Sequence, residues 1–400
     1  MIVAESALGR MTRKSPVGAF RSFAKGKKVG WLSFGGWINA IIPVLIVPYY
    51  SVIGGWVVKY LFEYIRGNGS KLAEDGYFSG FISSGGATEI CFVIFCMFTL
   101  VIIYAGVQNG IERVSKIMMP ILIVLSVIIA IYSVTRPGAI EGVKYFLVPN
   151  VKNFSWMTVV AAMGQMFYSL SIAMGILVTF GSYMRKDTSI EDSTRNVEIF
   201  DTAIAMMAGL MIIPAVFAFS GGDPDTLQAG PSLMFITIPK VFANMGFGTA
   251  VGILFFVLVL FAAVTSSIAL TESAVSTFED ELGWGRKKAT VLTGVIMITL
   301  GTLSCLGYGP LDFVKIIGMQ FLDFFDFLTN SVMMPIAALM TSLLVSRVIG
   351  VDKIEEEIRH GESTFRRKKI FVVMIKYLCP IFALIILASS VANAFGWIAM

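Results

Sequence analysis

Four hundred residues with 56% hydrophobic and only 14% charged side chains, and a mean hydropathy of +0.81, exclude an ordinary soluble protein. The net charge of +5 comes without a nucleic-acid-binding motif, so we expect no nucleic-acid partner. All four cysteines lie in apolar segments and show neither disulfide nor metal-site spacing: Cys91, Cys96, Cys305 and Cys379. The composition therefore predicts an all-α, polytopic membrane protein.

In chain order, the apolar runs predict nine membrane-spanning helices, because a helix needs about 20 apolar residues to cross a bilayer. The runs are residues 30–62, 89–107, 111–135, 157–183, 197–220, 247–278, 289–307, 312–347 and 370–399. They do not alternate apolar and polar residues as the strands of a membrane barrel do. No linker or soluble segment interrupts them, so residues 1–400 are predicted to form a single membrane domain.

The basic residues predict the orientation of these helices. If the first loop, residues 9–28, is cytoplasmic, most of the 31 lysines and arginines lie on that side, as the positive-inside rule requires. The N-terminus is then cytoplasmic and the C-terminus is outside. Among the outward loops, residues 221–246 are too apolar for a free loop, and we expect a short helical hairpin packed against the bundle.

Two groups of hydroxyl side chains interrupt the apolar runs. In "FYSLSIAMG", residues 167–175, two serines precede a glycine, which fits either close helix packing or an unwound segment that holds a ligand. In "LFAAVTSSIAL", Thr265, Ser266 and Ser267 are consecutive. One such hydroxyl often bonds to a carbonyl of its own helix, whereas three favour ligation of a hard cation such as Na⁺.

Other polar residues in the spans are tyrosines and acids. Tyr49 and Tyr50 follow Pro48 near the middle of a span, where a phenol needs a partner. Five acids lie in or at the ends of helices, where charge is costly and usually functional: Glu5, Asp201, Asp312, Asp323 and Asp326. The only histidine, His360, is in a predicted cytoplasmic loop, and no nucleophile–base pair or phosphate loop is visible. We therefore expect no enzyme.

Seven motifs in order resemble the bacterial branch of the sodium-coupled neurotransmitter and amino-acid symporter family. They are "ESALGR", "PYYSVIGGW", "NGIERVSKIMMP", "GQMFYSLSIAMG", "FITIPKVF", "AAVTSSIAL" and "FEDELG". The resemblance covers nearly the whole chain and implies a fold of two inverted five-helix repeats, in which "SLSIAMG" is the unwound part of the sixth family helix. It also implies Na⁺-coupled symport of a neutral, hydrophobic or aromatic amino acid across the bacterial inner membrane.

The resemblance implies a substrate site for the amino acid. Carbonyls of Tyr168, Ser169 and Ser171 would receive the substrate ammonium. The Tyr50 hydroxyl would bind the substrate carboxylate, and Tyr168 would close over it as part of an outer gate. Four residues would line the side-chain pocket: Ile46, Met174, Ser266 and Leu270.

The same resemblance implies ion sites and gates. The Ala262 carbonyl and the hydroxyls of Thr265 and Ser266 would contribute to one Na⁺ site. Ser169 would contribute to the other, with Asp201 at or beside its ligands. Two more acids would serve as gates: Asp312 on the outer side and Asp280 on the inner side.

The chain departs from the family pattern at its start, which resembles the inner end of the second family helix. The first family helix and most of the second are then expected to be missing, with residues 1–9 as a remnant. Because the first helix supplies carbonyls to both Na⁺ sites, we expect no Na⁺-dependent amino-acid binding until it is restored. The alternative is a non-transporting remnant, or a binding or assembly module.

Overall fold

The computed structural model describes residues 1–24, 30–223, 227 and 230–397, and helices make up most of them. The α-helices are α1 (Ile2–Thr12), α2 (Pro16–Ala24), α3 (Ser33–Ile65), α4 (Gly69–Leu72), α5 (Tyr77–Ser83), α6 (Gly86–Tyr104), α7 (Arg113–Val134), α8 (Ala139–Leu147), α9 (Trp156–Ser169), α10 (Ile176–Tyr183), α11 (Ile190–Ser220), α12 (Ile238–Ala243), α13 (Gly248–Leu282), α14 (Arg286–Leu306), α15 (Phe321–Asp326), α16 (Met334–Leu343), α17 (Val351–Arg359), α18 (Lys368–Val373) and α19 (Cys379–Ala394). Short 3₁₀ or π-helical segments are η1 (Gly30–Leu32), η2 (Val107–Glu112), η3 (Val151–Asn153), η5 (Leu233–Thr237), η6 (Phe327–Met333), η7 (Leu344–Ile349) and η8 (Met374–Leu378).

Within the described residues, eight continuous helical runs are long and apolar enough to cross a membrane. They are Gly30–Ile65, Gly86–Tyr104, Gly110–Val134, Ile190–Ser220, Gly248–Leu282, Arg286–Leu306, Phe321–Ile349 and Lys368–Ala394. The remaining predicted span, residues 157–183, is present as two shorter helices, α9 and α10, separated by a break. The predicted start of another span, residue 312, is wrong. Residues 307–320 form turns there, with Ile317 and Gly318 at positive φ, and the helix begins at Phe321.

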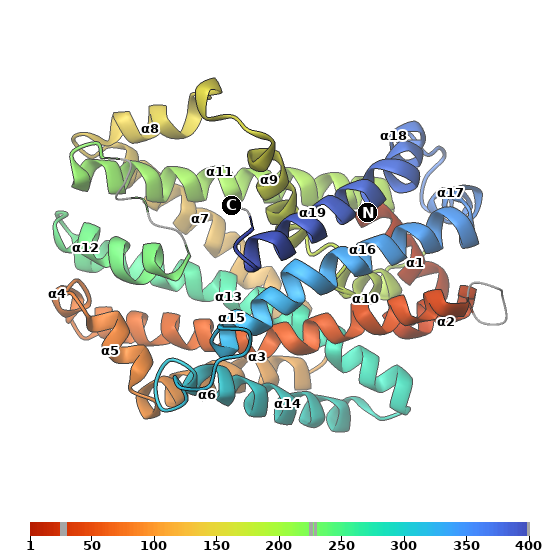
Figure 1. The fold of residues 1–400 in the computed structure, drawn as a ribbon, viewed down its shortest axis with the longest axis horizontal. Coiled ribbons are helices and arrows are strands. Elements are labelled where there is room, and N and C mark those ends of the chain that lie inside the picture. Colours follow the sequence, from red (N-terminus) through yellow and green to blue (C-terminus); the bar gives the residue numbers. More distant parts are fainter. Residues whose placement is uncertain (25–29, 224–226, 228–229, 398–400) are drawn as a thin grey trace.

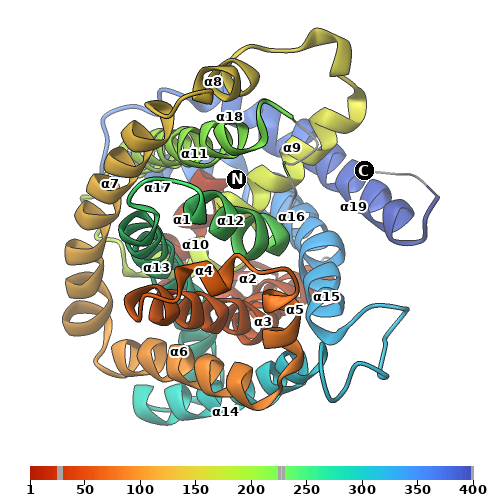
Figure 2. The ribbon, with the colours of Figure 1, turned by 90° about the vertical axis from the view of Figure 1, so that its left-hand side faces the viewer.

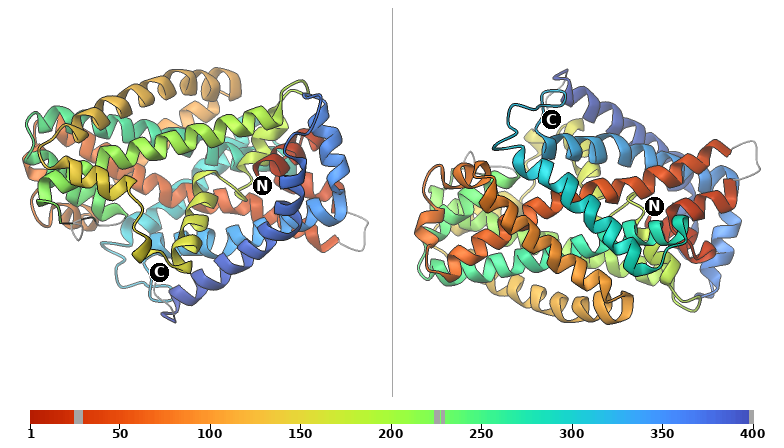
Figure 3. Two further views of the ribbon diagram at one scale, coloured as in Figure 1. Left: turned by 90° about the horizontal axis from the view of Figure 1, so that it is seen from above. Right: turned by 90° about the horizontal axis from the view of Figure 1, so that it is seen from below.

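The long helices run roughly side by side (Figure 2), and α3 belongs to the most buried of the eight runs. It packs against α13, α6 and α14. The N-terminal helix α1 also lies inside the bundle, whereas α19 crosses the other helices obliquely (Figure 3). Glycines allow α1 to approach α10 closely, since a Cβ on Gly9 would lie 2.0 Å from the carbonyl oxygen of Val178. The predicted remnant at residues 1–9 is therefore an integral core helix.

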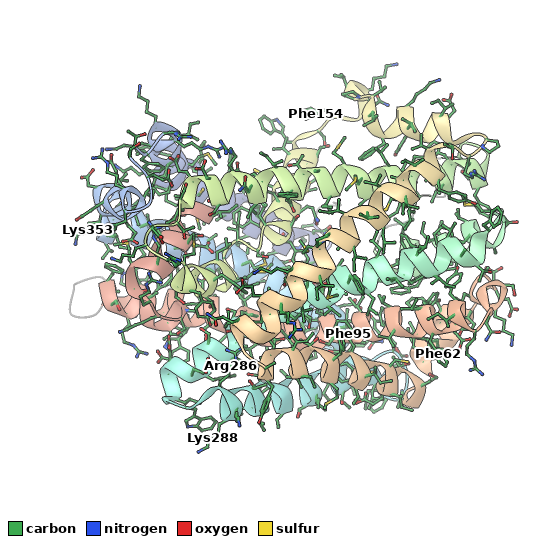
Figure 4. The ribbon with its side chains drawn as sticks, turned by 180° about the vertical axis from the view of Figure 1, so that it is seen from behind. Phe62, Phe95, Phe154, Arg286, Lys288 and Lys353 are labelled. Carbon is green, nitrogen blue, oxygen red and sulfur yellow. The ribbon has the colours of Figure 1, made fainter. Side chains whose placement is uncertain are left out.

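Loops predicted for the same side of the membrane gather at the same end of the bundle. Helices α2, α17 and α18 lie at one end, and α4, α8 and α12 at the other (Figure 1). Figure 4 shows Lys288 and Lys353 toward the first end and Phe62 toward the second. This arrangement agrees with the alternation of spans that the basic residues predict.

Part of the predicted hairpin at residues 221–246 is a short helix, Leu233–Ala243, and residues 224–226 and 228–229 lie outside the described residues. Aromatic side chains fix this helix to the bundle. Phe235 lies 5.7 Å from Trp56 and 5.0 Å from Tyr60, measured between ring centroids. The Tyr60 hydroxyl also donates a 2.8 Å hydrogen bond to the Phe235 carbonyl. Edge-to-face rings of this kind stabilise the contact beyond simple area burial.

Candidate functional site

Contacts from neighbouring helices maintain the break between α9 and α10. Ser171 (φ 54°), Ala173 (φ 59°) and Gly175 (φ 71°) all have left-handed backbone angles, which cost a non-glycine residue roughly 1–3 kcal/mol. Glu5, fully buried on α1, accepts hydrogen bonds from the Ala173 N–H at 3.0 and 3.3 Å. A Cβ on Gly175 would lie 2.7 Å from the Asn39 carbonyl oxygen. Neighbouring helices therefore hold the "SLSIAMG" segment unwound, and the structure agrees with the unwound interpretation of the sequence.

A cavity of about 540 Å³ lies beside this break. Its lining includes every residue that the sequence predicted for the amino-acid site, together with Thr265 of the predicted ion site. The lining residues are Ile46, Tyr50, Ser115, Met119, Gln165, Tyr168, Ser169, Ser171, Met174, Ile176, Thr265, Ser266, Ala269 and Leu270. The sequence analysis did not single out Ser115, Met119, Gln165, Ile176 or Ala269. Spacing could have suggested some of them, since Ser115 and Met119 share one face of α7.

The cavity has an apolar side and a hydroxyl side. Ile46, Met174 and Leu270 supply buried apolar surface. Tyr50, which interacts with Ser266, and Ser169 supply hydroxyl groups at the lining. No charged side chain is among the residues that line it. Such a surface suits a ligand with an uncharged apolar group and a small polar end.

The three consecutive hydroxyls of α13 lie in two different environments. Thr265 and Ser266 line the cavity, and the Thr265 hydroxyl donates to the carbonyls of Phe261 and Ala262, at 3.0 Å each. Ser267 turns away, is fully buried and accepts a 3.1 Å hydrogen bond from Thr99 of α6. Ser267 therefore serves helix packing, and only its two neighbours face the cavity.

Ser169 and Asp201, the two groups predicted for a second ion site, are brought together by the fold. The Ser169 hydroxyl at the end of α9 donates to Asp201 Oδ1 of α11 at 2.5 Å. The carboxylate thus lies directly behind the hydroxyl that lines the cavity. Hydroxyl and carboxylate oxygens are ligands that hard cations prefer.

The two predicted gate acids lie away from this cavity. Asp280, near the end of α13, accepts a hydrogen bond from the backbone N–H of Ser15. Asp312 is in the 307–320 turn region and accepts a hydrogen bond from the side chain of Gln320. Because the helix begins only at Phe321, Asp312 does not reach the cavity.

A different acid lies close to the site. Asp326 accepts hydrogen bonds from the Tyr49 hydroxyl (3.1 Å) and Asn330 Nδ2 (2.5 Å). It lines a second cavity of about 440 Å³, which shares Gln165 and Tyr168 with the first. The sequence marked Asp326 only as an acid in a span, because its partners are on other helices or one turn further along its own.

Comparisons with known proteins find similarity over most of the chain. The model of the "Sodium:neurotransmitter symporter family" matches residues 77–396. The uncharacterized sodium-dependent transporter YhdH of Bacillus subtilis is 34% identical over 91% of this chain and 80% of its own length. An uncharacterized sodium-dependent transporter of Haemophilus influenzae is 31% identical over 98% of this chain and 86% of its own.

One solved structure extends the similarity to the fold. The crystal structure of MhsT in complex with L-phenylalanine superposes with a TM-score of 0.85 and 34% sequence identity. The superposition covers 97% of this chain and 87% of that chain. The predicted all-helical membrane-transporter fold is thereby confirmed.

Proposed function

The chain belongs to the sodium:neurotransmitter symporter family, and we propose that it carries a neutral, hydrophobic or aromatic amino acid together with Na⁺ across the bacterial inner membrane. It is a sodium-dependent, multi-pass membrane transporter and not an enzyme, with Na⁺ as the co-transported ion. The observation that carries the substrate class is the uncharged cavity beside the unwound segment.

The substrate assignment follows from the lining of this cavity. Ile46, Met174 and Leu270 would contact the substrate side chain, because they provide apolar surface without a charge. The substrate carboxylate would bind the Tyr50 hydroxyl. Its ammonium would bind the carbonyls of Tyr168, Ser169 and Ser171 at the helix break, where the Tyr168 carbonyl accepts a 3.1 Å hydrogen bond from the Ser171 N–H in place of a regular helical bond. The L-phenylalanine in the MhsT structure supports a substrate of this size and polarity.

The ion assignment uses the oxygens around the same cavity. One Na⁺ would bind the Ala262 carbonyl with the hydroxyls of Thr265 and Ser266. The other would bind at Ser169, with the Asp201 carboxylate supplying negative charge at 2.5 Å from that hydroxyl. Shared use of this region by ions and substrate would couple their movement.

The proposal also assigns an orientation in the membrane and a gate to each end of the bundle. The N-terminus would be cytoplasmic and the C-terminus outside, which is supported by the gathering of basic loops at one end of the bundle. Asp280 would act at the inner end, where it already holds the α1–α2 loop through Ser15. Asp312 would act at the outer end, away from the cavity.

Uptake by proteoliposomes tests the proposal. We expect Na⁺-gradient-driven uptake of L-phenylalanine that disappears when choline replaces Na⁺. Absence of Na⁺-dependent uptake would refute the function, and preference for a charged amino acid would refute the substrate class.

Neighbouring hydroxyls of α13 provide a matched pair of variants. Thr265→Ala combined with Ser266→Ala is expected to abolish the Na⁺ dependence. Ser267→Ala is expected to retain it, because Ser267 bonds to Thr99 rather than lining the cavity. Equal loss in both variants would show that the effect is a general one on helix packing.

A further inference from the structure

A third cavity, of about 420 Å³, lies at the end of the bundle that carries α8 and α12 (Figure 1). It is formed where α7 and α11 end and α12 turns back toward α13. Its lining is apolar except for Arg136, Asn244 and the backbone. The lining residues are Arg136, Pro137, Ala215, Ala218, Phe219, Val241, Asn244, Met245 and Gly246.

Arg136 is held in place but incompletely bonded. Its guanidinium lies over the Tyr132 ring, 4.2 Å from the centroid, and the Tyr132 hydroxyl donates to the Gly246 carbonyl on the opposite wall. Among the residues that the structure describes, the buried Nε atom of Arg136 has no hydrogen-bond partner, and no ion pair is formed by Arg136. Arg136 is only half-buried, but a buried N–H of a cationic group without a partner is costly, so this cavity favours an anion.

The depth of the cavity relative to the membrane narrows the class of anion. Arg136 lies two residues beyond Val134, where the α7 span ends, and Phe219 lies in the last turn of the α11 span. This is the level of lipid headgroups. On α7, a continuous exposed stripe with helical spacing runs toward the same end: Ile117, Ile121, Val124, Ile128 and Ile131.

We propose that this cavity binds an anionic phospholipid, with the phosphate at Arg136 and the start of an acyl chain against Ala218 and Phe219. A free inorganic anion would use Arg136 but leave the apolar wall uncovered. A phospholipid satisfies both surfaces and continues along the exposed stripe of α7. Its binding would join the ends of α7 and α11 to α12, the short helix that covers this end of the bundle.

A second arginine at the end of a span serves as a matched control for Arg136. Arg66 directly follows α3, which ends at Ile65, and its guanidinium lies over the Phe62 ring, 5.2 Å from the centroid. It is therefore also an arginine at the end of a span and stacked on an aromatic ring, but it is not part of the Arg136 cavity.

Native mass spectrometry of the purified full chain in detergent tests the proposal. Phosphatidylglycerol is titrated against the wild type, Arg136→Gln, Arg136→Lys and Arg66→Gln. We expect Arg136→Gln to weaken phosphatidylglycerol binding about tenfold, as loss of a charge-assisted hydrogen bond predicts. Arg136→Lys should retain part of the affinity, and Arg66→Gln should retain all of it. Equal weakening by the two glutamine variants, or none by Arg136→Gln, would overturn the site.

Two further ligands separate the possible sources of the anion. Phosphatidylcholine, which has the phosphate but no net charge, is expected to bind more weakly than phosphatidylglycerol. Inorganic phosphate is expected not to displace the lipid at millimolar concentration. Displacement by inorganic phosphate would identify a simple anion site, and equal binding of the two lipids would show that Arg136 does not select charge. A matching thermal midpoint for Arg136→Gln and the wild type without lipid confirms that the variant is folded.

Discussion

Arg10 of α1 and Glu357 of α17 form a buried ion pair between segments 347 residues apart in the chain, with Arg10 Nε 2.7 Å from Glu357 Oε1. Arg10 also donates to the carbonyl of Thr188 at 2.5 Å and to that of Glu357 itself. One guanidinium therefore connects α1, the loop before α11 and helix α17. Its five donors suit this arrangement, which a lysine could not reproduce.

Arg10→Gln is expected to destabilise the protein by about 3 kcal/mol, because it leaves the buried Glu357 carboxylate without its cation. Thermal unfolding in detergent measures this as a lowered midpoint. The control is Arg359→Gln, which removes an ion pair of similar length (2.8 Å to Glu355) from a more exposed position on the same helix. This variant should cost about 1 kcal/mol or less. Similar shifts for the two variants would contradict a special role of Arg10.

Asp201→Asn is expected to raise the Na⁺ concentration needed for half-maximal uptake about tenfold, since a neutral amide replaces the carboxylate beside Ser169 that we propose as an ion ligand. The maximal rate at saturating Na⁺ should fall less. Glu198→Gln is the control, because Glu198 lies one turn earlier on α11 and pairs with Arg367 instead. If Na⁺ dependence is the same in wild type and Asp201→Asn, the second ion site is not at Ser169 and Asp201.

The local sequence marked the position of the helix break but left close packing and unwinding open, and the resemblance to a known family decided for unwinding. Hydroxyls and a glycine inside an apolar run are unusual in sequence, and the structure has the break at residues 170–175. Composition and apolar run lengths likewise predicted most spans. The resemblance to a known family then selected, from residues far apart in the chain, the set that lines one cavity.

Contacts between distant helices could not be predicted in the same way. Nothing near Ser267 in the sequence indicates that it bonds to Thr99 while Ser266 faces the cavity. The start of the span at Phe321 also depends on a turn at Ile317 and Gly318, which hydropathy does not detect. Each of these features is decided by rotation or register of a helix, and the apolar composition is the same for either outcome.

Single-cysteine labelling tests the orientation of the bundle. Lys71→Cys, at the end that carries α4, should react with a membrane-impermeant maleimide in intact cells. Lys353→Cys, on α17, should react only after permeabilisation. Both side chains are exposed, so neither result depends on local opening. The reverse pattern would invert the topology and move Asp280 to the outside.

A single methionine closes the apolar end of the proposed substrate site. Met174 is only 3% exposed and lines the cavity with Ile46 and Leu270. A methionine can adjust its conformation to ligands of different shape, whereas a phenylalanine is rigid and fills more of the space.

Met174→Phe is therefore expected to reduce L-phenylalanine uptake about tenfold relative to L-alanine uptake, as overpacking against an aromatic substrate would do. Competition of both amino acids for uptake in one preparation measures the ratio directly and cancels differences in protein amount. Met174→Leu keeps the apolar character and nearly the volume, so it should change the ratio little. A ratio that is unchanged in Met174→Phe would mean that the substrate side chain lies elsewhere in the cavity.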